Sequence, residues 1–192
     1  MCKQIGLSKR KKIQHNNGFT LIEAMTVVAI LAILSMITIP SYVNYLGYHQ
    51  IQSIQKNLYS TLRTVRLKAI TNAQNVIMCA SENLTHCIKN SKKDTDWSAG
   101  WIVFLDINQN NQRDTEFEEL LSIQTSFDNQ HVKWNRGSWL SYNYDGKVNM
   151  NGSFFICSQQ LDNKENSRAI IINRVGRPYQ SNKTASGNQI TC

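Results

Sequence analysis

The longest apolar stretch of the chain runs from Phe19 to Ile39 and contains one acid, Glu23, and no Lys or Arg. As a helix it would be about 30 Å long at roughly 1.5 Å per residue, the thickness of the hydrocarbon core of a bilayer. A lone carboxylate in such a segment costs several kcal/mol unless it is paired or neutralised. The pattern therefore predicts a membrane-spanning helix in which Glu23 has a specific role.

Beyond Pro40, apolar residues recur every three or four positions, which is the spacing of one face of a helix. The repeat predicts that the helix continues through residues 41–75 and that Pro40 kinks or loosens it rather than ending it. We expect the apolar stripe to pack on the domain that follows, with a short coiled coil to another chain as the alternative. Its members are Ile51, Ile54, Leu58, Leu62, Val65 and Ala69.

From residue 76 onward, short runs rich in β-branched and aromatic residues replace the helical repeat, and Asp145-Gly146 is typical of a two-residue hairpin turn. The fold class indicated is α+β, with a long N-terminal helix packed on an antiparallel β-sheet domain at 76–192. Loops are expected at 88–99 and after Pro178. The predicted strands are Val76–Ala80, Trp101–Leu105, Glu119–Thr125, Ser138–Tyr144, Lys147–Asn149, Ser153–Ser158 and Ala169–Asn173.

The segment before Phe19 is basic, with five Lys or Arg residues and no acid, in a chain of 192 residues with a formal net charge of +8. The positive-inside rule keeps this leader in the cytoplasm and places residues 41–192 on the opposite side of the membrane. An ordinary secretory signal has small residues after its apolar run, whereas here the small-residue junction, Gly18-Phe19, precedes it. The excess of positive charge is therefore mainly a targeting feature rather than a sign of nucleic-acid binding.

The segment Gly18-Phe19-Thr20-Leu21-Ile22-Glu23, together with the apolar run and Pro40, resembles the prepilin signature of type IV pilins and type II secretion pseudopilins. The resemblance implies that a prepilin peptidase removes residues 1–18, that the new Phe19 amine is methylated, and that residues 19–40 serve as inner-membrane anchor and assembly helix. Glu23 would then meet the Phe19 ammonium of a neighbouring subunit, which offsets two desolvation costs together. The alternative is a carboxyl that snorkels to the interface or is simply protonated.

Motifs in the rest of the chain resemble the GspH/FimT (FimU-like) branch of minor pilins and pseudopilins. They are Arg63-x-x-Arg66, Cys79, the segment from Trp97 to Asp114 and the segment from Arg168 to Arg177. The branch implies a type IV pilin-like fold with a periplasmic or extracellular GspH/FimT domain. It also implies a subunit that helps to initiate assembly and sits at the tip of a pilus used in motility, adhesion or DNA uptake, with other minor and major pilins as partners. The alternatives are a FimT-like DNA-binding subunit for natural transformation and an H-type pseudopilin of a type II secretion system.

Four cysteines follow the leader, and an even number outside the cytoplasm predicts two disulfides. Three connectivities exist. We favour one disulfide between Cys79 and Cys87, closing a small loop, and one between Cys157 and Cys192, tying the tail to a strand. A zinc site at His86-Cys87 would lack a second pair of ligands, so no metal is expected there.

The segment from Asp106 to Asp114 places oxygen-bearing side chains at alternate positions, as the start of a calcium loop does. However, Asn111 replaces the usual turn glycine and Phe117 stands where a glutamate belongs. A polar turn stabilised by Asn and Asp side chains is therefore favoured over a calcium site. The sequence has no nucleophile-elbow motif and no phosphate-binding glycine loop, so neither enzymatic activity nor a cofactor is expected.

Charge is distributed unevenly along the β-rich domain. Residues 82–131 carry four basic and nine acidic side chains, whereas residues 132–192 carry eight basic and three acidic ones. A basic stripe can bind phosphates, but the FimT-like tail motif Gly-Arg-x-Arg reads Gly176-Arg177-Pro178-Tyr179 here and lacks its second arginine. A solvated face or a contact with an acidic neighbouring subunit is therefore favoured over DNA. The candidate DNA-binding residues are Arg168, Arg174, Arg177 and Lys183.

Overall fold

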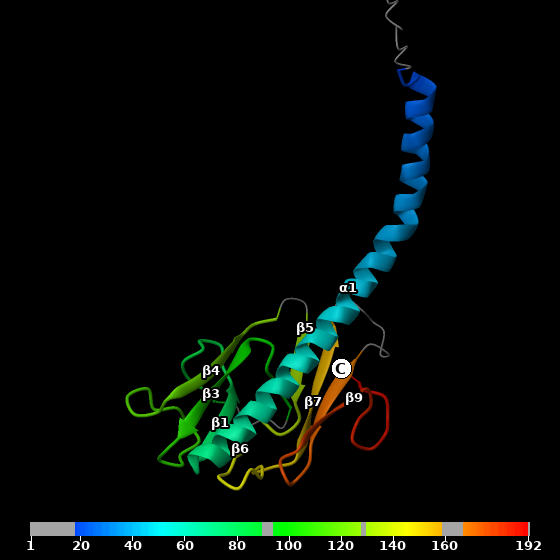
Figure 1. Ribbon diagram of the computed structural model, residues 1–192. Helices are drawn as coiled ribbons and strands as arrows, with labels where there is room; N and C mark the ends of the chain where they lie inside the picture. The colour runs from blue at the N-terminus through cyan, green and yellow to red at the C-terminus, as the bar shows by residue number, and fades with distance from the viewer. Residues whose placement is uncertain (1–17, 90–93, 128–129, 159–166, 192) are drawn as a thin grey trace, which may run out of the picture. The chain divides into compact units, whose positions relative to one another are not determined.

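The computed structural model describes residues 18–89, 94–127, 130–158 and 167–191, without the side chains of 37–41, 43 and 44. The chain divides into two compact units, Met1–Tyr42 and Val43–Cys192. Helix α1 (Leu21–Asn72) contributes to both units, and its helical backbone passes through Pro40 (Figure 1). The proline thus does not end the helix, as the periodicity predicted; its side chain lies outside the described residues.

The first unit consists of the start of α1 and the residues before it. The Thr20 hydroxyl accepts a hydrogen bond from the Glu23 amide at 3.3 Å, and the Thr20 carbonyl accepts one from Ala24 at 3.2 Å. Thr20 is therefore the N-cap, and Glu23 lies in the first turn, where the helix dipole favours a carboxylate.

The large apolar side chains of this unit are exposed, from Phe19 and Leu21 through Ile22, Val28 and Leu31 to Met36. They therefore have no core of their own to pack in. In the part of the chain that the structure describes, no helix is both long enough and apolar enough to cross a membrane.

In the second unit the predicted apolar stripe of α1 is buried from Ile51 to Ala69 and belongs to the main hydrophobic core. Figure 1 shows this half of the helix lying over the strands. One polar residue interrupts the stripe: Gln55 is buried and donates hydrogen bonds to the Ala169 carbonyl at 2.9 Å and the Ser181 carbonyl at 3.2 Å. The stripe therefore packs within its own chain, as predicted, and Gln55 fastens the helix to two strands.

Among the residues that the structure describes, nine strands form two antiparallel sheets. The four-stranded sheet has the order β4-β3-β1-β6 and the five-stranded sheet the order β2-β5-β7-β8-β9. The α+β fold class predicted from the sequence is confirmed. The strands are β1 (Asn75–Ala80), β2 (Thr95–Asp96), β3 (Gly100–Asp106), β4 (Leu120–Thr125), β5 (Gln130–Trp134), β6 (Trp139–Tyr142), β7 (Gly152–Ser158), β8 (Arg168–Ile172) and β9 (Pro178–Ser181).

Four segments differ from the strand predictions. β2 and β5 were not predicted, and β9 occupies residues expected to form a loop, because the tail pairs with β8. The segment Lys147–Asn149 forms only an isolated bridge between Val148 and Tyr142. The Asn149 side chain accepts the Ser141 amide at 3.0 Å and so replaces a regular strand pairing. A turn does form here, but the Asn143 amide donates to the Lys147 carbonyl at 2.9 Å, so the loop has the three residues 144–146 rather than the predicted two, Asp145-Gly146.

Candidate interaction surface

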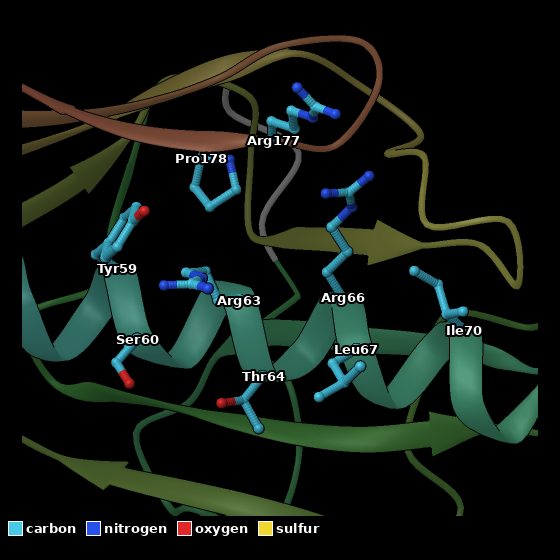
Figure 2. A pocket seen from close by; sticks show the side chains of 9 residues that line it. All are labelled: Tyr59, Ser60, Arg63, Thr64, Arg66, Leu67, Ile70, Arg177 and Pro178. Carbon is cyan, nitrogen blue, oxygen red and sulfur yellow. The ribbon is translucent and has the colours of Figure 1, made fainter.

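A groove of about 710 Å³ lies between the exposed side of α1 and the turn that joins β8 to β9. Figure 2 shows Tyr59 and Arg66 rising from α1 toward the segment that carries Arg177 and Pro178, with Arg63 between them on the helix. Because three of the lining side chains are arginines, we call it the basic groove. Its lining residues are Tyr59, Ser60, Arg63, Thr64, Arg66, Leu67, Ile70, Arg177 and Pro178.

The helix supplies two of these arginines because of their position in the helical repeat. Arg63 and Arg66 are three residues apart and lie off the buried stripe, so they project on one side of α1. Residues 41–81 contain four Lys or Arg side chains and no acid, so no acidic side chain in this half of the helix opposes their charge. The Arg63 guanidinium lies 5.7 Å from the centre of the Tyr59 ring, within the range of a cation–π contact.

Arg66 connects the helix to two turns. Its Nε donates to the Gly146 carbonyl at 2.9 Å and its Nη2 to the Val175 carbonyl at 3.2 Å. Beneath it, the Tyr142 side chain is fully buried, and its hydroxyl has no hydrogen-bond partner among the described residues. Burial raises the pKa of the Tyr142 phenol, and the positive charge of Arg66 opposes that shift. Arg66 therefore helps to hold the wall of the groove as well as lining it.

Two glycines make this wall possible. Gly146 and Gly176 both have φ near +75°, a conformation that side chains rarely adopt. A Cβ on Gly176 would lie 2.1 Å from the Gly146 carbonyl oxygen, and a Cβ on Gly146 would lie 2.7 Å from Ile70. The two turns thus pack directly on each other and on α1, which fixes the position of Arg177 at the edge of the groove.

The groove is both cationic and apolar. The ion pairs found in the described residues are His131–Asp96 and Lys147–Asp145, so none of them involves Arg63, Arg66 or Arg177. Two further lining residues, Leu67 and Ile70, are 59% and 46% exposed. A partner that buries apolar surface and supplies carboxylates or phosphates would match both properties.

The structure separates the four residues predicted as a DNA-binding stripe. Only Arg177 reaches the basic groove, whereas Arg174 lines a different hollow of about 450 Å³ together with Arg136 and Lys147. The Arg168 guanidinium lies 5.2 Å from the centre of the Tyr48 ring on α1. Lys183 lies in the turn that follows β9.

The sequence prediction omitted Arg63 and Arg66 from this set. Their i, i+3 spacing on the polar side of a helical stretch without acids, residues 41–75, was the signal that could have identified them.

The processing and assembly residues lie in the first unit. Phe19 is 87% exposed, and nothing surrounds the position of a Cβ on Gly18. Glu23 is exposed one turn into the helix. Their roles in cleavage, methylation and subunit pairing, and that of Pro40, stay predictions.

One predicted disulfide is confirmed. Cys79 and Cys87 are bonded and close the small loop that follows β1. Cys157 is also disulfide-bonded, while its predicted partner, Cys192, lies outside the described residues.

The segment after β3 forms the predicted polar turn. The Asp106 carboxylate accepts hydrogen bonds from the amides of Asn110 and Asn111, each at 3.2 Å. Side chains of Asn108 and Asn110 cap amides two residues further on. Burial and the negative charge of Glu118 raise the pKa of Asp106, partly offset by the backbone hydrogen bonds. Within the described ranges no group of three His, Cys, Asp or Glu residues is arranged to hold a metal ion.

The same connection ends in an outward-facing segment, Asp114–Glu119, which we call the acidic loop. Glu118 is buried, and its two carboxylate oxygens accept the amides of Ile107 at 3.0 Å and Asp114 at 2.8 Å. The neighbouring Phe117 is 73% exposed, and Glu116 and Glu119 are exposed on either side of it. Glu118 thus fixes the loop, and the loop presents an aromatic ring between two carboxylates.

Comparison with known proteins gives two family matches. Residues 55–176 match the model of the type II transport protein GspH, and residues 13–39 match the prokaryotic N-terminal methylation motif. No curated protein matches the chain significantly in sequence.

Three solved structures are similar to the chain. Two crystal structures of the type IV minor pilin FimU of Pseudomonas aeruginosa each share 16% identity with it, with TM-scores of 0.53 and 0.55. They cover 71% and 72% of this chain and 98% and 95% of their own. The minor pseudopilin EpsH of the Vibrio cholerae type 2 secretion system shares 10% identity, with a TM-score of 0.49 over 69% of this chain and 96% of its own.

Proposed function

Because this chain belongs to the GspH family and carries an N-terminal methylation motif, it is a minor pilin or pseudopilin, and we propose that it helps to initiate a type IV pilus and sits at its tip. Membership implies assembly with other pilins, processing by a prepilin peptidase and anchoring in a membrane. The observation that carries the proposal is the arrangement of Gly18, Phe19 and Glu23 at the start of an apolar helix. We propose no catalytic role and no cofactor.

In this proposal the apolar segment 19–39 is a single-pass inner-membrane anchor, and the β-rich domain is periplasmic until the filament carries it to the cell surface. Cleavage after Gly18 exposes the Phe19 amine. The N-cap at Thr20 holds Glu23 in the first turn of α1, where its carboxylate can meet the Phe19 ammonium of a neighbouring subunit. The exposed apolar side chains of this unit support a role in which lipid, and later other helices, cover them.

The test compares Gly18→Ala and Glu23→Ala strains with a wild-type strain. We expect Gly18→Ala to leave an unprocessed chain on a denaturing gel, and Glu23→Ala to be processed but excluded from filaments. Thr26→Ala is the matched control, because Thr26 is an exposed polar residue on the next turn whose hydroxyl bonds only the Glu23 carbonyl. Normal processing and normal filaments in both test strains would overturn the proposal.

A type II secretion pseudopilin is the alternative within the same family, and its membrane chemistry would be identical. A deletion strain separates the two machines. Loss of surface pili and twitching with normal secretion supports the pilus, whereas retained pili with enzymes trapped in the periplasm supports the secretion system.

A DNA-binding pilus subunit is a second candidate function, favoured by the three guanidinium groups that line one groove. Phosphate binding would make the affinity fall steeply with salt, and each lost contact would reduce the slope of log K against log[salt] by about 1. Gel shifts with the full-length chain in detergent test this across a salt series. Arg177→Glu should weaken binding, and Arg174→Glu, in the separate hollow, is the control. Equal binding by all three proteins would exclude the groove as a DNA site.

A further inference from the structure

The basic groove and the acidic loop have complementary chemistry on one chain. The groove has three arginines without an ion pair among the described residues, and it is also lined by the exposed Leu67 and Ile70. The acidic loop has four acids in six residues and no base, around the exposed Phe117. We propose that the basic groove of one copy binds the acidic loop of a second copy, so that copies of this chain associate head to tail.

The loop is suited to be the inserted element because it is already fixed. Glu118 accepts the amides of Ile107 and Asp114 with its two oxygens, and the Glu119 carbonyl accepts the Leu105 amide at 3.1 Å. These bonds fix both ends of the loop and turn Phe117 outward. A segment that is ordered before binding loses little conformational entropy on association, and an exposed aromatic ring is a typical anchor of an interface.

The groove is suited to receive it because each feature of the loop meets its complement. The Phe117 ring would cover Leu67 and Ile70, and it could also lie against a guanidinium group. Glu116 and Glu119 flank the ring in the loop, and Arg63 and Arg177 line the same groove as Leu67 and Ile70. An arginine fork binds a carboxylate through two hydrogen bonds. DNA would satisfy the arginines but would leave the apolar floor and the exposed Phe117 without a role.

The two surfaces lie on different elements of the second unit, so the contact would be heterologous. The acidic loop connects β3 and β4 of the four-stranded sheet, whereas the groove lies between α1 and the β8–β9 turn of the five-stranded sheet. A copy bound through its groove still has a free loop, so such contacts close into a ring or extend as an open series rather than forming a closed pair. This inference goes beyond the tip position proposed above and does not depend on which machine the filament serves.

The test is crosslinking of the full-length chain in its own membrane, with a photoreactive phenylalanine analogue in place of Phe117. We expect an adduct with the mass of two copies, and peptide mapping should place the crosslink in residues 59–70 or 177–178. Reversing the groove with Arg63→Glu and Arg177→Glu should lower the adduct yield about tenfold. The matched control is Lys56→Glu with Lys183→Glu, which makes the same charge change on exposed lysines outside the groove and should leave the yield unchanged.

A charge swap separates a direct contact from a folding defect. One tagged copy carries the reversed groove, and a second, differently tagged copy carries Glu116→Arg and Glu119→Arg. Neither should crosslink well to itself, but the groove of the first should bind the loop of the second and restore the mixed adduct.

Three results would overturn the inference: adducts only with other proteins, a two-copy adduct that ignores groove reversal, or no recovery in the swapped pair. If the groove–loop contact fails one of these tests but filaments still require Gly18 and Glu23, the proposed function stands. Failure of the contact can therefore be distinguished from failure of the proposed function.

Discussion

Both halves of α1 are regular α-helix, but their apolar side chains lie in different environments. After Val43 the stripe from Ile51 to Ala69 is buried in the chain's own core, whereas before Tyr42 side chains such as Ile22 and Leu31 are exposed. The second half is thus stabilised within the chain, while the first half has exposed apolar surface that is available to other molecules. The difference separates residues that maintain the fold from residues available for assembly.

The same substitution in each half tests this comparison most strongly. Leu62→Ala removes a fully buried side chain and should lower the free energy of unfolding of the second unit by about 2–5 kcal/mol. Leu31→Ala removes an exposed side chain and should change that free energy by less than about 0.5 kcal/mol. Denaturant unfolding of the full-length chain in detergent, followed by the fluorescence of the buried Trp97, Trp101 and Trp134, measures both. Equal losses would contradict the comparison.

The Cys79–Cys87 disulfide should stabilise the second unit and should not affect the first. Cys79→Ser with Cys87→Ser removes a crosslink between residues eight positions apart, which should cost the second unit about 2–3 kcal/mol. Cleavage after Gly18 should be unaffected, because it depends on the first unit. Unfolding curves measure the stability of the second unit, and gel mobility of the same protein measures cleavage. A double variant that stays unprocessed would show that cleavage depends on the second unit.

Two glycine-to-alanine substitutions test whether the turns of the groove wall pack on each other. Gly176→Ala places a Cβ at positive φ against a backbone carbonyl and should destabilise the second unit by about 1–3 kcal/mol. Gly187 also has positive φ, but nothing lies within 4 Å of its Cβ position, so Gly187→Ala should cost only the strain, about 1 kcal/mol. Thermal unfolding of both variants measures the difference, and equal losses would mean that the turns do not pack as described.

The smallest expected effect is the pH dependence of stability that Asp106 causes. Burial and Glu118 raise the pKa of Asp106 above its ordinary value of 3.8, so the folded chain holds this proton to a higher pH than the unfolded chain. The stability that Asp106 contributes is therefore complete below about pH 3.8 and is lost as the pH rises through the folded-state pKa. The free energy of unfolding of wild type relative to Asp106→Asn should fall as the pH rises from 3.5 to 7. A difference that stays constant or grows with pH would contradict this assignment.

Periodicity was enough to predict the helix, its buried stripe and most strands, because α1 and the central strands bury regular apolar patterns. β9 could not be predicted from local signals, since Pro178 and Tyr179 pair with β8 only in the folded domain. The basic groove was missed for the same reason: Arg177 lies more than 100 positions from Arg63 and Arg66 in the chain, and the packing of Gly146 on Gly176 brings them together.

We propose that the first half of α1 becomes an assembly element once the chain is cleaved after Gly18. The chemical identity of the mature N-terminus is the most direct test of this proposal. Mass spectrometry of the chain isolated from membranes and filaments measures it. We expect a chain that begins at Phe19 and carries a methyl group on its amine. A chain that still begins at Met1, or one cut after the apolar segment, would contradict it.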